Sequence, residues 1–321
     1  MFFSNALIFA FFAARRHRRD HAGTVARVLQ GRFLRVAVFA TFAALVLVGV
    51  AGAANSISFT DPAGDAGSGS DAAPDITNVA VSSDDSGTIT VRVTVANRPT
   101  TLQPDDELGV DLDLDQNPDT GTVLYGTEVA TVFEGSSPEF LRPDKSNTYF
   151  EQVAPPPSYL AGFANGVATF SVKASDLGLS PTGGFNVFAL ADNGSSGDTA
   201  PDIRTVNYQL VPGTPPPALG LDTRPPFDRA FTAHGVRGKV VHLDVISADG
   251  RGQSADTFRV YRRHHLLATH SYDLGDTIPF VTYYSPWRVP RHIRGPLRFC
   301  ASSVDAAGNK SNVSCARIIL R

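Results

Sequence analysis

Residues 110–121 have the sequence V-D-L-D-L-D-Q-N-P-D-T-G. Apolar and acidic residues alternate from 110 to 114, which predicts a half-buried β-strand with an acidic outer face. The strand leads into a turn in which oxygen-bearing side chains continue at every second position. The candidate ligands of this stretch are Asp111, Asp113, Asp115, Asn117 and Asp119. Carboxylate and amide oxygens that converge in this way suit a hard cation such as Ca²⁺.

Two other interpretations of this stretch fail on its neighbours. The D-x-N-x-D spacing matches the start of an EF-hand loop, but Thr120 stands where glycine is required and Gly126 where glutamate is required. Residues 119–121 spell the D-T-G of aspartic proteases, whose chemistry needs two carboxylates that share a proton. The chain has no second D-T-G. We therefore expect calcium in a β-turn here.

Charge is distributed unevenly along the 321 residues. Residues 1–54 carry seven Arg and one Asp, and residues 55–212 carry six basic and 22 acidic residues. Residues 213–321 carry 15 basic and eight acidic residues. The length allows two domains and a targeting segment. One domain is therefore acidic and the other basic, a contrast that bears on their partners.

The N-terminal 54 residues have the pattern of a secretory signal. Residues 36–54 contain no charge, Arg32 and Arg35 precede them, and A-G-A at 51–53 supplies small residues for cleavage. The alternative is an uncleaved anchor, because an apolar run of this length can just cross a bilayer. We expect a bacterial protein that is secreted or held at the extracellular face of the cell envelope. Membrane contact is expected only through an uncleaved N-terminal segment.

Residues 55–211 predict an all-β domain. Short alternating runs are separated by Gly, Pro, Asn and Asp, a pattern typical of a β-sandwich or jelly roll. A single helical turn is expected within 173–179. The expected strands are 76–81, 89–95, 108–114, 128–133, 167–172, 185–190 and 205–211.

The pattern D-x-A-P-D-I-x-x-V occurs twice, at 71–79 and at 198–206, and D-P-A-G-D precedes the first copy at 61–65. Terminal strands of a sandwich commonly lie close together, so we expect the copies to face each other at one end of the fold. Because uncompensated carboxylates repel, this end is predicted to hold a cation, with 110–121 as one of its walls. Turn formation alone would also explain Asp-rich loops. The further candidate ligands are Asp61, Asp65, Asp75, Asp198 and Asp202.

These motifs, together with Gly126 and Glu128 after the acidic stretch, resemble extracellular bacterial sandwich domains related to family 9 carbohydrate-binding modules and the DOMON-like group. The resemblance covers about residues 57–211 and implies a β-sandwich, often with structural calcium and in some members with sugar or haem. Haem is set aside because this domain has no Met and no His. Sugar binding would use exposed aromatic side chains, although aromatics in sandwiches usually pack in the core. The candidates are Tyr125, Tyr149, Phe150, Tyr159 and Phe163.

A Pro-rich linker at 212–219 leads to a second all-β domain at 220–321. Its clearest signal is the final hairpin, where a turn between residues 307 and 308 would place Cys300 opposite Cys315. A disulfide is then expected in an oxidising compartment. The V-D-A-A-G-N-K-S stretch at 304–311 resembles the last hairpin of bacterial immunoglobulin-like or fibronectin-like modules, which implies a spacer or adhesion role.

No nucleophile or acid–base motif occurs in the chain, so no enzyme is expected. The favoured hypothesis is a binding or adhesion protein with a calcium-stabilised sandwich and a basic immunoglobulin-like module. Its expected partner is a polysaccharide or, through the Arg content of the basic domain, an anionic cell-wall polymer. Nucleic acid is not expected, because no recognition motif is present. Two alternatives stay open: an ancillary or cryptic hydrolase that acts on glycans through Glu128, Glu134 or Glu151, and a purely structural surface spacer.

Overall fold

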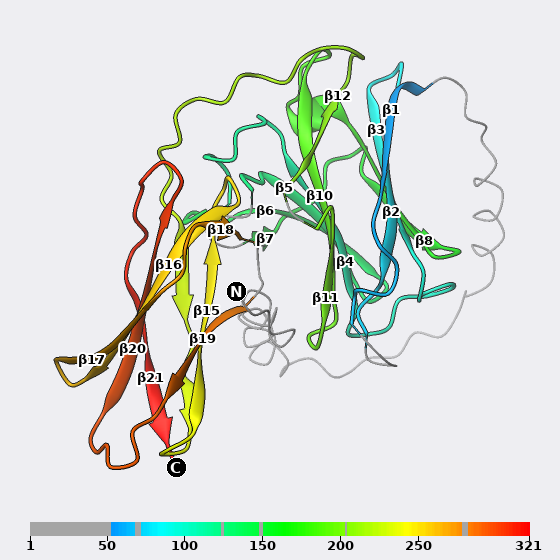
Figure 1. Ribbon diagram of the computed structural model, residues 1–321. Helices are drawn as coiled ribbons and strands as arrows, with labels where there is room; N and C mark the ends of the chain where they lie inside the picture. Colours follow the sequence, from blue (N-terminus) through cyan, green and yellow to red (C-terminus); the bar gives the residue numbers. More distant parts are fainter. Residues whose placement is uncertain (1–52, 68–71, 123–124, 148–149, 203, 278–281) are drawn as a thin grey trace, which may run out of the picture.

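The computed structural model describes residues 53–67, 72–122, 125–147, 150–202, 204–277 and 282–321 (Figure 1). The predicted signal segment lies outside these residues except for Ala53 and Ala54, with which the first strand begins. In the described part of the chain, no helix is long and apolar enough to cross a membrane.

The first domain is a sandwich of two antiparallel sheets. In one sheet the strand order is β1 (Ala53–Thr60), β2 (Ile76–Asp84), β3 (Thr88–Val95), β9 (Val167–Lys173) and β8 (Leu160–Ala164). In the other it is β11 (Gly197–Ala200), β10 (Gly184–Asp192), β4 (Glu107–Asp113), β5 (Val129–Glu134), β6 (Ser137–Pro143) and β7 (Phe150–Gln152). β12 (Val206–Gln209) pairs with β10 beyond β11. The prediction of an all-β sandwich is confirmed.

The core of this domain lies between the two sheets and follows from the alternation of the strands. Val79 and Val81 of β2 face it together with Val91 and Val93 of β3, and Val110 faces it from the opposite sheet. A 3₁₀ turn at Ala174–Leu177 occupies the predicted helical position. Its end falls at Gly178, whose φ of +83° favours glycine.

The prediction of an acidic outer face on β4 is wrong. All residues from Leu108 to Asp113 are buried, and Asp111 is only 3% exposed. β4 is an interior strand of its sheet, between β10 and β5, and Asp111 is paired directly with Phe188 on one side and Ala130 on the other. The outward face of this sheet is therefore largely apolar around Asp111, which the alternation along a single strand does not reveal.

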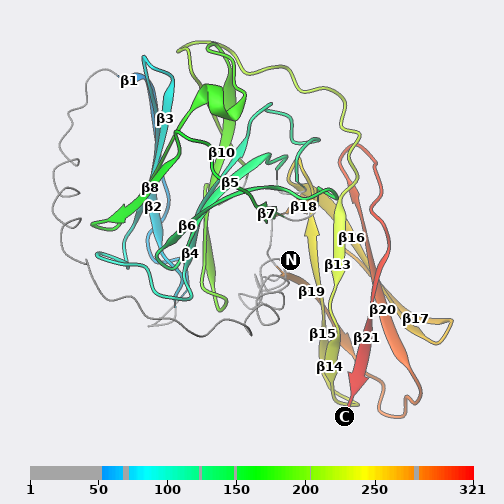
Figure 2. The ribbon, with the colours of Figure 1, turned by 180° about the vertical axis from the view of Figure 1, so that it is seen from behind.

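The second domain is a smaller sandwich with an immunoglobulin-like strand arrangement (Figure 2). One sheet has the order β13 (Phe227–Ala230), β15 (Val240–Ala248) and β19 (Thr282–Arg288). The other has the order β14 (Ala233–Gly235), β21 (Ser314–Leu320), β20 (Leu297–Asp305), β16 (Gln253–Arg262) and β17 (His265–Ser271), with β18 (Gly275–Asp276) paired to β16. β14 runs parallel to β21, and the other pairings are antiparallel.

The predicted disulfide is present. Cys300 and Cys315 are direct partners on β20 and β21, and their Cα atoms are 4.0 Å apart. The bond therefore joins neighbouring strands of one sheet rather than the two sheets of the sandwich.

The domains lie side by side (Figures 1 and 2). The loop that follows β4 meets the loops around β16 and β18. Tyr125 Oη donates to the carbonyl oxygen of Thr277 at 3.4 Å, and a Cβ at Gly250 would lie 2.2 Å from the carbonyl oxygen of Pro118. The calcium-type turn predicted at 115–121 thus lies at the domain junction.

Candidate metal sites

The two D-x-A-P-D-I segments meet, as predicted. The amide of Ile76, in the first copy, donates to Asp198 Oδ2 of the second at 2.6 Å. The amide of Ala73 donates to Ser196 Oγ at 2.8 Å. Asp198 lies on β11 opposite Ala191, so the second copy is held at the edge of one sheet while the first enters β2 of the other. This contact closes one end of the sandwich.

Five predicted ligands gather at this closed end, which we call the acidic end. They form two groups, in each of which one carboxylate oxygen per residue lies within 4.8 Å of the others. The first group is Asp61, Asp65 and Asp202, and the second is Asp65, Asp75 and Asp198. Asp65 belongs to both groups. Both carboxylate oxygens of Asp75 accept from the amide of Gly64, at 2.9 and 3.1 Å, which holds the D-P-A-G-D loop against the strand.

The electrostatics of the acidic end are unfavourable without a cation. Burial raises the pKa of Asp61 to about 7, with further contributions from Asp202, Asp65 and Asp75. Burial raises the pKa of Asp198 to about 8, and the charges of Asp61 and Asp65 add to this effect. No basic group contributes to either shift. Carboxylates this close favour a shared proton or a bound cation.

One oxygen of the acidic end has no hydrogen-bond partner. Asp61 is 9% exposed, and its Oδ2 atom is buried without a donor among the described residues. Buried polar atoms in folded proteins nearly always have a partner, and an unmet carboxylate oxygen is often explained by an ion. Oxygen-only donors of this kind suit Ca²⁺. The residues present therefore fit the predicted cation.

The ligands predicted in residues 110–121 are not at the acidic end. Asp113 and Asp115 form a separate group with Glu128, again within 4.8 Å. Asp113 lies opposite Asn186 of β10, whereas β11 pairs with residues 189–192 farther along the same strand. The structure thus divides the predicted single site into two. Glu128 was not among the predicted ligands, although it is the first residue of the strand predicted at 128–133.

The oxygens of this second group, the strand-turn group, are used within the turn. The amide of Asn117 donates to Asp113 at 3.0 Å and to Asp115 at 2.9 Å. Thr120 Oγ1 donates to Asp115 and Glu128, each at 3.0 Å, and Glu128 also accepts from the Leu114 amide at 2.7 Å. Burial, opposed in part by hydrogen bonds, raises the pKa of Asp113 and of Glu128 to about 7. These hydrogen bonds give the three carboxylates a structural role in the turn that does not need a metal.

Asp111 is separate from both groups. Burial alone raises its pKa to about 8, and its Oδ2 atom has no partner in the described part of the chain. Its direct neighbours across the sheet are Phe188 and Ala130, and it belongs to none of the acidic groups found among the described residues.

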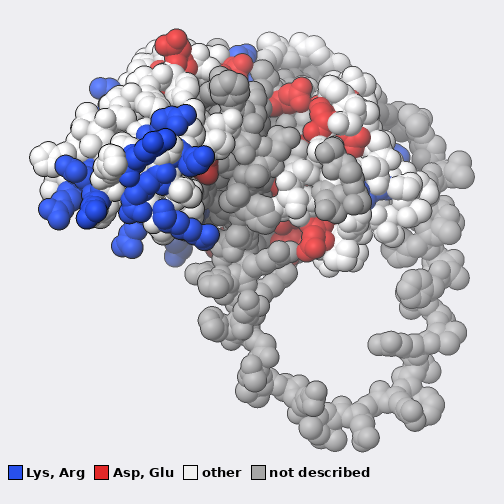
Figure 3. Space-filling view, turned by 60° about the horizontal axis from the view of Figure 1, so that its bottom comes forward, with Lys and Arg blue, Asp and Glu red and all other residues white. Residues whose placement is uncertain are grey.

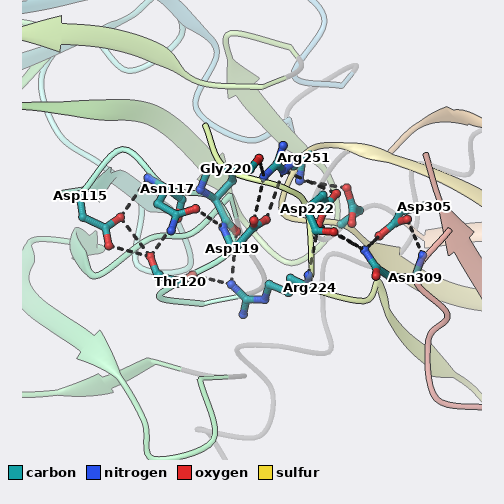
Figure 4. Close-up of polar contacts among 12 residues, drawn as sticks. Asp115, Asn117, Asp119, Thr120, Gly220, Asp222, Arg224, Arg251, Asp305 and Asn309 are labelled. Carbon is teal, nitrogen blue, oxygen red and sulfur yellow. Dashed lines mark hydrogen bonds and ion pairs between the residues drawn. The ribbon is translucent and has the colours of Figure 1, made fainter. Parts of the chain in front are cut away.

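Asp119 instead joins the two domains (Figure 4). Arg251 Nη2 lies 2.8 Å from Asp119 Oδ2, and both side chains are mostly buried. Arg224 donates to four carbonyls of the turn: those of Pro118 and Thr120, of Gly121 at 3.1 Å, and of Thr122 at 2.8 Å. The turn for which the sequence predicts a metal is therefore held by two guanidinium groups, those of Arg251 and Arg224.

A further acidic group lies on the other side of this junction. Asp222, Asp249 and Asp305 place oxygens within 4.8 Å of one another. Arg251 Nε lies 3.5 Å from Asp222 Oδ2, and the Asn309 side chain donates to Asp305 Oδ2 at 2.8 Å. Sequence reasoning missed this group. The available signal was D-x-R, which occurs at 222–224 and again at 249–251.

Comparisons with known proteins add little. No family model matches the chain, and no curated protein matches it. A solved structure of fibronectin(III)-like modules of CbhA from Clostridium thermocellum shows 12% identity and a TM-score of 0.21, covering 74% of this chain and 86% of that one. The A168169 fragment of titin shows 10% identity and a TM-score of 0.21, covering 74% and 91%. Latent PorU from Porphyromonas gingivalis shows 7% identity and a TM-score of 0.23, covering 73% and 32%. With TM-scores this low, these similarities carry no argument about function.

Proposed function

We propose that this chain is an extracellular binding or adhesion protein whose acidic first domain is stabilised by calcium. The observation that supports this most is the acidic end, where the D-P-A-G-D loop and the two D-x-A-P-D-I segments place five aspartates in two overlapping groups, with no basic partner among the described residues. A divalent cation would neutralise these carboxylates and hold the first and last strands of the sandwich together.

The disulfide supports an extracellular location, because such bonds persist in oxidising compartments. Outside the acidic groups, the described residues include a serine–histidine contact, His270 Nδ1 to Ser285 Oγ at 2.8 Å, but this serine is fully buried and also accepts from Tyr272 Oη at 3.1 Å. The charges that the structure brings together hold loops and domains, which supports binding over catalysis.

The partner within this function is proposed to be a polysaccharide or an anionic cell-wall polymer. None of the described aromatic side chains is exposed. Of the candidate platforms, Tyr125 is buried, Tyr159 packs on Phe140, and Phe163 packs on Phe133. Tyr149 lies outside the described residues. Recognition through charge is therefore favoured over stacking on a sugar ring.

Calcium titration by calorimetry tests the metal. Asp65→Asn removes a charge from both groups, so calcium affinity should fall by about 100-fold or more, since affinity depends on the number of charged ligands. The matched control is Asp85→Asn, at an exposed position outside the groups, which should bind calcium like the wild type. Equal affinity in all three proteins would remove calcium from the proposal.

A hydrolase is the second candidate, and one observation favours it. Asp113 and Glu128 place carboxylate oxygens within 4.8 Å, and both have a raised pKa. Retaining glycosidases use two carboxyl groups about 5 Å apart. Release of sugars from wall polymers by the wild type, abolished by Glu128→Gln, would establish this candidate in place of the first.

A further inference from the structure

The end of the second domain farthest from the junction is strongly basic. Figure 3 shows Lys and Arg gathered over one part of this domain, while Asp and Glu lie mostly elsewhere. A pocket of about 530 Å³ opens here. Its lining consists of Arg237, Arg291, His292, Ile293 and Arg294. We call it the basic pocket.

Two loops build the basic pocket. Arg237 lies in the turn between β14 and β15, and the other four residues lie in the connection from β19 to β20. The loops are joined by backbone hydrogen bonds, from Gly238 to the Val289 carbonyl and from Val289 to the Lys239 carbonyl, both 2.9 Å. The two loops that line the pocket are therefore held together by backbone hydrogen bonds.

The side chains are arranged for an anion. Arg237 Nε donates to the Ile293 carbonyl at 3.1 Å, which fixes one guanidinium beside the buried Ile293. Arg291 passes over Gly238, where an added Cβ would lie 2.9 Å from Arg291 Cγ. Arg291 and Arg294 form no ion pair with a carboxylate of the described chain, whereas Arg237 Nη1 donates to the main-chain oxygen of Arg321 at 3.5 Å. The charges of Arg291 and Arg294 are thus left for a ligand.

The sequence around the pocket contains no acid. Residues 286–298 and 233–243 include no Asp or Glu, whereas Asp222, Asp249 and Asp305 lie at the junction. The second domain is therefore polarised, with its uncompensated positive charge at the free end. Such a field attracts polyanions and raises their association rate.

We propose that the basic pocket binds the phosphate groups of a linear anionic polymer. Guanidinium groups recognise phosphate oxygens through paired hydrogen bonds, and a pocket admits a group that projects from a chain. Single-stranded nucleic acid is typically held by bases stacked on Phe, Tyr or Trp, and none of these lines the pocket, where the one ring is that of His292. Interfacial aromatic anchors for a membrane are also missing, because no described aromatic is exposed. This inference rests on the proposed binding function, for which it names the partner class, and on none of the calcium ligands.

The test is binding of fluorescent long-chain polyphosphate to the full chain at several salt concentrations. Arg291→Gln with Arg294→Gln removes two charges from side chains that make no hydrogen bond among the described residues, so folding should be kept. Affinity should fall by about tenfold or more, with a shallower dependence on salt. The matched control, Lys173→Gln with Lys310→Gln, removes the same charge from exposed positions elsewhere and should bind like the wild type. Arg291→Lys with Arg294→Lys should be intermediate, because charge is kept and the planar fork is lost.

Three results would overturn the inference. One is equal loss of affinity in the Gln pair and its control. Another is tighter binding to vesicles of phosphatidylglycerol and phosphatidylcholine than to polyphosphate, which would indicate a membrane. The third is tighter binding to a single-stranded thymidine oligomer, which would indicate base recognition. If polyphosphate binding fails these tests while the protein still binds calcium, the proposed calcium site of the first domain is unaffected.

Discussion

The acidic end of the first domain and the acidic group at the domain junction contain the same kind of side chain, but their charge is balanced differently. At the junction, Arg251 lies between Asp119 and Asp222, and Arg224 is partly buried nearby. At the acidic end, Asp61 and Asp198 feel other carboxylates and no basic group. Two arginines of the chain partly neutralise the junction, whereas no basic group offsets the carboxylates of the acidic end among the described residues, which favours a proton or an external cation there.

The comparison also bears on the turn at 113–119, where the sequence predicts calcium. The D-x-D-x-N-x-D spacing at 113–119 has the ligands of a calcium loop, yet its last aspartate pairs with an arginine 132 residues away. The five aspartates of the acidic end come from three separated segments. Local spacing is therefore a weaker guide to a metal site than the balance of charge after folding.

The largest effect on stability is expected when an arginine is removed from the junction. Arg251→Gln leaves Asp119 and Asp222 without their shared cation, so the free energy of unfolding of the second domain should fall by about 1–3 kcal/mol. Denaturant titration followed by tryptophan fluorescence measures this, since Trp287 lies in that domain's core. Arg262→Gln, at an exposed position of the same domain, is the control. A junction variant as stable as this control would show that the guanidinium does not balance the acidic side chains.

The pH dependence of stability should separate the two regions. Asp61 and Asp198 have folded pKa values of about 7 and 8, well above the ordinary aspartate value of 3.8, so the folded state holds protons that the unfolded chain releases. This contribution is complete below about pH 4 and is lost as the pH rises through 7 to 8. In EDTA the first domain should therefore be less stable at pH 8 than at pH 5, and calcium should reduce the difference. Calorimetric melting across this range that showed no fall in EDTA would contradict the assigned proton linkage.

The smallest effect is expected at the strand-turn group. Asp113→Asn with Glu128→Gln keeps an acceptor oxygen at each position, so calcium affinity should change by less than about twofold because the acidic end is distant. Stability should change by about 1 kcal/mol or less. Calorimetric titration of this variant beside Asp65→Asn makes the comparison direct. Should the strand-turn variant lose calcium and Asp65→Asn keep it, the metal belongs to residues 113–128.

Much of the fold could be predicted because interior strands are strongly patterned. The alternation at 89–95 and 167–172 matches β3 and β9 closely, and the spacing of the last hairpin places Cys300 opposite Cys315. Edge strands were missed: β8 has an exposed Leu160 and no clear apolar face, and β7 and β11 have three and four residues. Short strands at a sheet edge depend on their neighbours more than on their own sequence.

The candidate site was predicted in part for a similar reason. The repeated D-x-A-P-D-I pattern gave the meeting of residues 75 and 198, because repeated entries to terminal strands suggest one end of a sandwich. The burial of Asp111 could not be predicted, because it results from Phe188 and Ala130 on adjacent strands. The contacts of the junction arginines could not be predicted either, because local sequence patterns do not determine how two domains are placed relative to each other.

The central proposal is that calcium stabilises the acidic end, because no basic side chain among the described residues offsets the charge of its aspartates. Its most direct test is the thermal unfolding of the full chain near neutral pH, in millimolar calcium and in EDTA. Calcium at about 100 times its dissociation constant adds about 2.7 kcal/mol. The midpoint of the first domain should then rise by about 5–10 °C, while that of the second domain stays unchanged. Identical midpoints for the first domain in calcium and in EDTA would contradict the claim.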